Sequence, residues 1–237
     1  MNFVLHAWLA HLDRGEPGVM LGAMLPDLWR MAARSARSRR GVTSPNNDST
    51  VSAVLAGVEH HLQADRWFHA TPYFAEGEAA TGDALKAVQG EASPRLRLFA
   101  HVTWEMCLDG ALVRRVGHGE VSAVVADAVR GRADAAGVAA DLHHGAARAA
   151  AGVDDAIFQA RMARLLDAVE SFALPEGYAD PAGVAMRLGG IRSAFGFPPA
   201  NLTERARWEQ AIATVEPVAD RLVAALLEDA ARPRPAT

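Results

Sequence analysis

The segment from Gly57 to His69 carries side chains that can bind a metal ion. Its His61, Asp65 and His69 are four residues apart, and the surrounding sequence predicts a helix. Residues at positions i, i+4 and i+8 of an α-helix lie on roughly one face, so these side chains can direct nitrogen and oxygen donors towards one point. Imidazole and carboxylate donors suit divalent ions such as zinc, iron and manganese, whereas a single Cys offers no thiolate-rich alternative.

Donors of the same kinds lie in other apolar segments. His101 and Glu105 repeat the four-residue spacing, and His6 lies in an apolar N-terminal segment. Asp27 lies in another apolar stretch, where an unpaired carboxylate would be costly. Such a set can hold metal and leave an open position for water. We therefore predict a centre for one or two divalent ions, Mn, Fe, Zn or Mg, with the metal ligands His6, Asp27, His61, Asp65, His101 and Glu105.

Each feature also has a purely structural interpretation. A His and an Asp four residues apart on a helix commonly form an exposed pair. His6 alone fits a packed core histidine, and Asp27 alone fits a helix N-cap or a partner of Arg30. Their concurrence in the most apolar parts of the chain, where solvated side chains are not expected, favours the metal centre.

Composition narrows the class of protein. The 237 residues are 50% hydrophobic and 22% charged, and the formal net charge of -4 argues against a general nucleic-acid binder. Cys107 is the single cysteine, so we expect no intrachain disulfide and a buried apolar role for it. The N-terminal segment lacks a basic region, and no later apolar run is long enough for a membrane span, so we expect a cytoplasmic protein.

Helical periodicity predicts an all-α fold, a single-domain helical bundle over residues 1–231 with a disordered tail at 232–237. Residues 76–91 are mixed and suggest only a connecting turn of helix. The polar residues before Val51, and the pairs Ser93-Pro94 and Asp180-Pro181, are typical of helix starts. The expected helices cover residues 2–12, 51–71, 94–116, 120–150, 153–173, 180–195 and 203–231.

Two groups of residues have alternative interpretations. We expect the adjacent His143 and His144 to face solvent or to end a helix, with a ligand role as the minor option. The arginines between Arg30 and Arg40 form either a solvated loop or a basic rim that attracts a phosphate-bearing or acidic partner. The candidate substrate-binding residues are Arg30, Arg34, Arg66 and Arg192, the last of which can also be a surface residue.

Four short motifs suggest a family. They are Met1-Asn-Phe-Val-Leu-His6, Gly22-Ala-Met-Leu-Pro-Asp27-Leu28, Gly57-Val-Glu-His-His61-Leu-Gln-Ala-Asp65-Arg-Trp-Phe-His69-Ala-Thr-Pro72 and His101-Val-Thr-Trp-Glu105-Met106. On these residues the chain resembles the acyl-carrier-protein phosphodiesterase family, a helical group similar to the HD-domain metal phosphohydrolases. The resemblance implies an HD-like helical fold, a metal-dependent phosphoric ester hydrolase, and catalytic roles for Asp65 and His69.

Some positions depart from the family's motifs. The family has Asp where this chain has His69, His101 and Glu105, histidines where it has Thr71 and Met106, and a basic residue in place of Leu62. Exchanging one ligand type for another keeps a metal centre and implies more nitrogen-rich coordination.

Two functions are therefore expected. The first is a phosphodiesterase that releases 4′-phosphopantetheine from an acyl carrier protein, or a hydrolase of another small phosphoester, with the basic rim docking the acidic carrier. The alternative is a catalytically inactive helical metal- or ligand-binding protein that keeps the family fold. The substitutions at Leu62, Thr71 and Met106 support the alternative.

Overall fold

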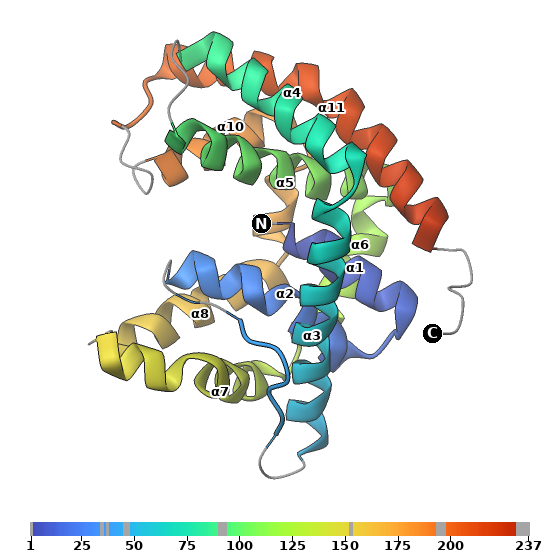
Figure 1. The fold of residues 1–237 in the computed structure, drawn as a ribbon, viewed down its shortest axis with the longest axis vertical. Coiled ribbons are helices and arrows are strands. Elements are labelled where there is room, and N and C mark those ends of the chain that lie inside the picture. Colours follow the sequence, from blue (N-terminus) through green and yellow to red (C-terminus); the bar gives the residue numbers. More distant parts are fainter. Residues whose placement is uncertain are drawn as a thin grey trace. The chain divides into compact units, whose positions relative to one another are not determined.

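The described residues of the computed structural model form helices joined by loops (Figure 1). They are residues 2–33, 36, 38–44, 48–89, 94–151, 154–192 and 198–230, and they contain no strand. The prediction of an all-α protein is confirmed. The helices are α1 Phe3–Asp13, α2 Pro17–Ala32, α3 Ser49–His69, α4 Pro72–Gln89, α5 Pro94–Val116, α6 His118–Val129, α7 Ala133–Ala151, α8 Asp155–Glu170, α9 Ala173–Glu176, α10 Pro181–Arg192 and α11 Leu202–Ala230.

Contacts group the chain into two compact units. Unit 1 contains residues 1–2, 68–118 and 175–237, and unit 2 contains residues 3–67 and 119–174. The chain passes from one unit to the other after residues 2, 67, 118 and 174, and the second of these points lies inside α3. The prediction of one domain over residues 1–231 stays a prediction, as does the likeness to the HD-domain fold. The predicted tail at 232–237 lies outside the described residues.

In unit 2, α2 is the central helix. It packs against α1, α7 and α8, and nearly all of its residues are buried. It also meets α3 at a close crossing, because a Cβ on Gly22 would overlap the Val54 carbonyl oxygen and the Cα of Gly57, and a Cβ on Gly57 would overlap the Val19 carbonyl oxygen. Asp48 caps α3, accepting hydrogen bonds from the amides of residues 50 and 51, as the polar sequence before the helix predicted.

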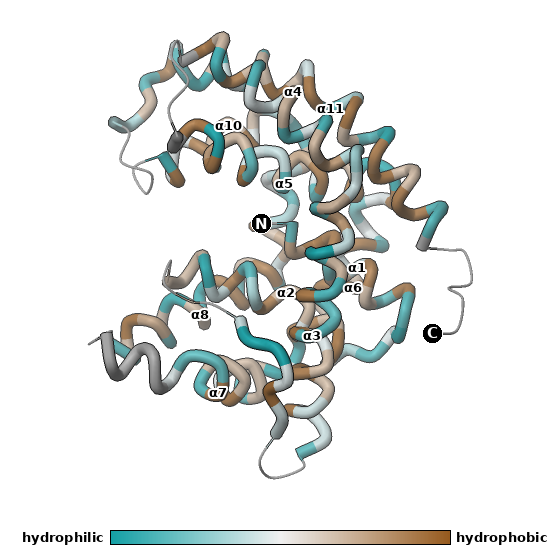
Figure 2. The backbone as a smooth tube through the Cα atoms, in the orientation of Figure 1, coloured by the Kyte–Doolittle hydropathy of each residue, from teal (hydrophilic) through white to brown (hydrophobic). Residues whose placement is uncertain are grey.

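In unit 1, α4, α5, α10 and α11 pack against one another. Figure 2 shows hydrophobic and hydrophilic residues alternating along α11, as expected for a helix with one buried face. An Asn201–Glu204 capping box starts this helix: each side chain accepts the other's backbone N–H, at 2.9 Å in both cases. The start of α11 agrees with the predicted helix to within one residue.

The full helix α4 corrects the prediction of a connecting turn at residues 76–91. Pro72, where we expected the preceding helix to end, is instead the first residue of α4, and Thr71 accepts the Phe74 N–H as its cap. The buried residues are Phe74, Gly77, Thr81 and Leu85, which follow helical spacing. Glycine and threonine are not strongly apolar, so the helical spacing of these buried positions was not visible in the sequence.

The predicted helix over 120–150 is also wrong in detail. It is divided into α6 and α7 at Gly131, whose φ of 68° is left-handed and ends α6. Asp180 caps α10 as predicted, accepting the Gly183 N–H at 2.7 Å. Ser93, the predicted cap of α5, lies outside the described residues. None of the described helices is long and apolar enough to cross a membrane.

Candidate metal centre

The first candidate metal-binding group consists of His6, His61 and Asp65 in unit 2. One ligand atom from each lies within 4.8 Å of the other two. His6 on α1 and His61 on α3 are 1% and 5% exposed, and their ring centroids are 3.9 Å apart. Asp65 lies one turn after His61 on the same helix. Three of the predicted ligands therefore meet.

The orientation of His61 suits a metal ligand. Its Nδ1 is 2.8 Å from the Ala23 carbonyl oxygen, which can only accept a hydrogen bond. Nδ1 therefore carries the proton in the neutral ring, and Nε2 carries the lone pair. Metal-binding histidines typically donate their second ring N–H to such an oxygen. The contact follows from the close crossing, because Ala23 is next to Gly22 and His61 is one turn after Gly57.

Asp27, a predicted ligand, lies one turn after Ala23 on α2 and is 8% exposed. It is not one of the three residues whose ligand atoms lie within 4.8 Å of one another. Its Oδ2 is nevertheless buried, with no hydrogen-bond partner among the described residues. A buried carboxylate oxygen without a donor is costly, so this oxygen has capacity for a proton donor or a cation.

The second candidate metal-binding group consists of His69, His101 and Glu105 in unit 1, again with ligand atoms within 4.8 Å of one another. Oε1 of Glu105 lies 3.3 Å from Nε2 of His101 and 3.7 Å from Nε2 of His69. His101 and Glu105 are one turn apart on α5, and Glu105 is buried. The predicted pair on this helix is thus joined by the last histidine of α3.

Glu78 on α4 is a functional candidate that sequence reasoning missed. Its Oε1 lies 3.1 Å from Nδ1 of His101. A carboxylate at Nδ1 fixes the ring orientation and directs Nε2 towards Glu105, in the manner of the carboxylate–histidine pairs that support metal sites. The sequence could have indicated Glu78 only through its place beside Gly77 on a helix. Residues 76–91 were predicted as a connecting turn instead, so this helix was not considered.

Charge holds the second group together. Burial alone would lower the pKa of His101, but the hydrogen bond to Glu105 and the charges of Glu105 and Glu78 outweigh burial and raise it. Burial alone would raise the pKa of the Glu105 carboxyl, but nearby positive charge and hydrogen bonds from His101 and His69 hold it well below its usual value. A divalent ion at the Nε2 of His101 would compete with a proton for that nitrogen, so metal binding there would release a proton.

The candidate substrate-binding arginines lie in different surroundings. Arg30 on α2 and Arg66 on α3 are exposed, whereas Arg34 lies outside the described residues. Arg192 is 7% exposed, forms an ion pair with Glu204 at 3.4 Å and lies over the Trp208 ring at 5.2 Å. It is therefore a buried packing residue, and its alternative placement on the surface was wrong.

The basic segment from Arg30 to Arg40 is partly engaged within unit 2. Arg39 donates to the Leu142 carbonyl oxygen at 2.7 Å, and Arg40 pairs with Glu59 at 3.2 Å. Both side chains are nevertheless exposed enough to meet a partner. The two interpretations of this segment stay open.

His143 and His144 are both 3% exposed, so the expectation that they face solvent was wrong. They lie inside α7 and pack on Trp29, at 5.0 and 4.8 Å between ring centroids. This contact joins residues more than a hundred positions apart, which local periodicity cannot reveal. Cys107 is buried as predicted, and burial raises the pKa of its thiol to about 12, so it stays protonated.

Comparison with known proteins adds no family assignment. The chain matches no protein-family model, no curated protein and no solved structure among those searched.

Proposed function

We propose that the protein is a metal-dependent phosphoester hydrolase whose first metal-binding group is His6, His61 and Asp65. The observation that carries the proposal is the burial of two imidazoles beside one carboxylate, with the Nδ1 of His61 held by the Ala23 carbonyl. Two imidazoles and one carboxylate leave coordination positions open, as catalytic metal sites require.

The residues of this group have distinct roles. His61, fixed by Ala23, presents Nε2, and His6 and Asp65 supply the other donors. A divalent ion held by these residues would supply an activated water and a Lewis acid for a phosphoryl oxygen. The role proposed for Asp65 besides holding the ion is to orient that water. The buried Oδ2 of Asp27 is an additional ligand or an acceptor for a proton.

The second group, His69, His101 and Glu105, is proposed as a further metal-binding position. Its support is the same donor set and the carboxylate of Glu78 behind His101. His69 is the ligand or the acid/base residue of this group. The donor sets fit zinc, iron or manganese better than magnesium, which prefers oxygen ligands.

The substrate class is a phosphoester, and the finer proposal is the phosphodiester between 4′-phosphopantetheine and a carrier-protein serine. Its support is the sequence resemblance and the exposed basic residues of unit 2. Arg66 is exposed and next to Asp65 in the chain, and Arg30 and Arg39 are exposed as well. These cations suit a phosphoryl group and an acidic protein surface.

Metal content and turnover test the proposal. The purified protein is expected to contain zinc, iron or manganese by mass spectrometry of the elements, and to hydrolyse bis(p-nitrophenyl) phosphate. The double variant His61→Ala, Asp65→Ala should lose both metal at the first group and turnover. His118→Ala, which removes an exposed histidine outside both groups, should change neither.

The outcomes separate the candidate functions. Absence of bound metal after incubation with each ion would exclude the proposal. Bound metal with no turnover of any phosphoester would favour the inactive binding protein. Release of 4′-phosphopantetheine from a holo carrier protein, lost in the double variant, would identify the finer substrate.

A further inference from the structure

Pro26 lies inside α2 and is buried. Proline has no backbone N–H, so the carbonyl of Gly22, four residues earlier, lacks the amide that would otherwise be its helical partner. The proline ring also occupies space next to that carbonyl, so the turn from Gly22 to Pro26 cannot close like the other turns of the helix. A proline at such a position is unfavourable for the helix itself, which indicates a compensating role elsewhere.

The turn that Pro26 opens contains the carbonyl that holds His61. Ala23 follows Gly22 in the chain, and its oxygen lies 2.8 Å from Nδ1 of His61. A helix carbonyl that accepts a hydrogen bond from another helix tilts away from its own helix axis, and this tilt is easier in a turn whose hydrogen bonds are already interrupted. His61 therefore donates its N–H at the one turn of α2 that the proline disrupts.

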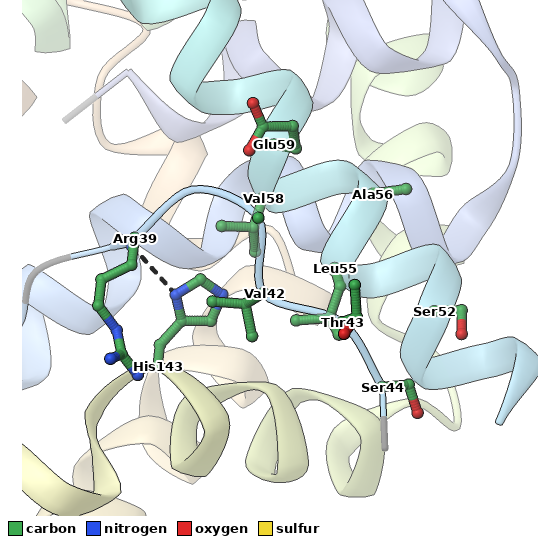
Figure 3. Close-up of a pocket in the computed structure, with 11 residues that line it drawn as sticks. Arg39, Val42, Thr43, Ser44, Ser52, Leu55, Ala56, Val58, Glu59 and His143 are labelled. Atoms are coloured by element: carbon green, nitrogen blue, oxygen red, sulfur yellow. Dashed lines mark hydrogen bonds between the residues drawn. The ribbon is translucent and has the colours of Figure 1, made fainter. Parts of the chain in front are cut away.

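The glycine crossing and the proline make separate contributions. Gly22 and Gly57 let the backbones of α2 and α3 come into contact, and His61 follows Gly57 by one turn on the same face of α3. Another face of α3 is turned elsewhere: Figure 3 shows Val58 at a cavity of about 380 Å³ beside the segment 39–44. The glycines thus set the distance between the two helices, whereas the proline affects the direction of the carbonyl.

We propose that Pro26 is a positioning residue for the first metal-binding group. By opening its turn of α2, it directs the Ala23 carbonyl to Nδ1 of His61 and so leaves the lone pair of Nε2 for a metal ion. Pro26 contacts neither metal nor substrate and acts through Ala23. The inference rests on the proposed function for the use of Nε2, but the state of the His61 ring can be measured without any metal.

A purely structural role for Pro26 gives the opposite result. If the ring only fills buried space, Pro26→Ala should lower stability and leave His61 as it is. If Pro26 positions the carbonyl, the same substitution restores an amide N–H and a better helix former, so the urea midpoint should be unchanged or higher. His61 should nevertheless lose part of its hydrogen bond to Ala23. Stability and the state of His61 together separate the two roles.

The tautomer of His61 is the direct measurement. In ¹⁵N spectra of the metal-free protein, at a pH where histidine rings are neutral, wild-type His61 should be the Nδ1–H tautomer. Loss of its signal in His61→Gln assigns it. In Pro26→Ala the ring should move towards the Nε2–H tautomer, which places a proton on the nitrogen that the metal needs. Zinc affinity of the first group, measured with a chelating dye, should fall about tenfold.

Pro217→Ala is the matched control. Pro217 also lies inside a helix, α11 of unit 1, where it is exposed. Its substitution should likewise keep or raise the urea midpoint, but leave the His61 tautomer and the zinc affinity of the first group unchanged. The same His61 tautomer in wild type and Pro26→Ala, or a loss of folding in Pro26→Ala, would overturn the inference. A wild type that binds no metal would exclude the proposed hydrolase, whereas the tautomers would still decide whether Pro26 acts on His61.

Discussion

The two candidate metal-binding groups each contain two imidazoles and one carboxylate, but they are supported differently. In the first, a backbone carbonyl holds Nδ1 of His61, and the crossing of α2 and α3 at two glycines fixes that contact. In the second, the Glu78 carboxylate holds Nδ1 of His101, and charge fixes the contact. The first group therefore depends on backbone geometry and the second on electrostatics. Different substitutions should disrupt each group.

The largest effect is expected from the glycine crossing. Gly57→Ala places a Cβ against the Val19 carbonyl oxygen, so α2 and α3 must separate and His61 must lose Ala23. We expect a loss of about 2–4 kcal/mol in the free energy of unfolding, measured by urea denaturation, because an overpacked backbone crossing cannot relax locally. Metal affinity of the first group should fall with it.

Gly137→Ala is the matched control. Gly137 lies inside α7, and a Cβ there meets nothing within 4 Å. The same change should therefore raise stability by about 0.5–1 kcal/mol through helix propensity. If both variants gave similar stability, the close crossing would not be what positions His61.

Removing one ligand from each group is expected to have the next largest effect. His61→Ala and His101→Ala should each lower metal affinity in their own group by about 100-fold or more, since loss of a ligand exceeds the 10–100-fold effect of a supporting residue. Competition with a chelating dye measures both affinities. Loss of all bound metal in either single variant would contradict the assignment of two groups.

The supporting carboxylate gives a smaller, more selective effect. Glu78→Gln keeps the shape of the side chain but removes its charge, so it should lower the pKa of His101 and weaken metal binding by the second group about 10–100-fold. The first group should be unchanged. Glu76→Gln, an exposed carboxylate on the same helix, is the control. Equal effects at positions 76 and 78 would mean that net charge, rather than the contact with His101, acts on the metal.

The sequence predicted the within-helix pairs but not their partners. The four-residue spacing places His61 with Asp65 and His101 with Glu105, because helix geometry alone fixes those pairs. That His6 joins the first pair and His69 the second depends on how helices cross, and these crossings depend on tertiary packing, including backbone contact at Gly22. Local periodicity carries no such information.

Residues hidden from the sequence share a physical cause. Glu78 and the buried face of α4 were not predicted, because Gly77 and Thr81 are buried without being strongly apolar. His143 was expected near solvent or at a helix end because its position in the sequence suggested a polar face or a nearby loop, yet Trp29 and the Arg39 amide enclose it. In both cases the burial comes from a distant segment, whereas the caps at Asp48 and Asp180 are local and were predictable.

The smallest expected effect is on the pH dependence of stability. It comes from His143, a buried histidine outside both groups, and is compared with the behaviour of His101. Burial, helped by the charge of Arg39, lowers the pKa of His143 to about 4, so the unfolded chain takes up a proton below pH 6.5 while the folded protein does not. His143 therefore destabilises the protein as pH falls from about 6.5 to 4, and its contribution is constant above that window. The full shift would correspond to about 3.4 kcal/mol, and we expect about 1–2 because local opening lets water reach the ring.

Urea denaturation of wild type and His143→Phe at pH 7.5 and pH 4.5 measures this contribution. The difference in stability between the two proteins should move in favour of the variant by about 1–2 kcal/mol at the lower pH, because phenylalanine cannot be protonated. The pKa of His101 is raised instead, so proton uptake there occurs at higher pH in the folded protein than in the unfolded chain. A His143 ring that titrates near 6.5 in the folded protein would contradict this prediction. Burial without a carboxylate partner would then not lower the pKa of a histidine, and the comparison with His101 would fail.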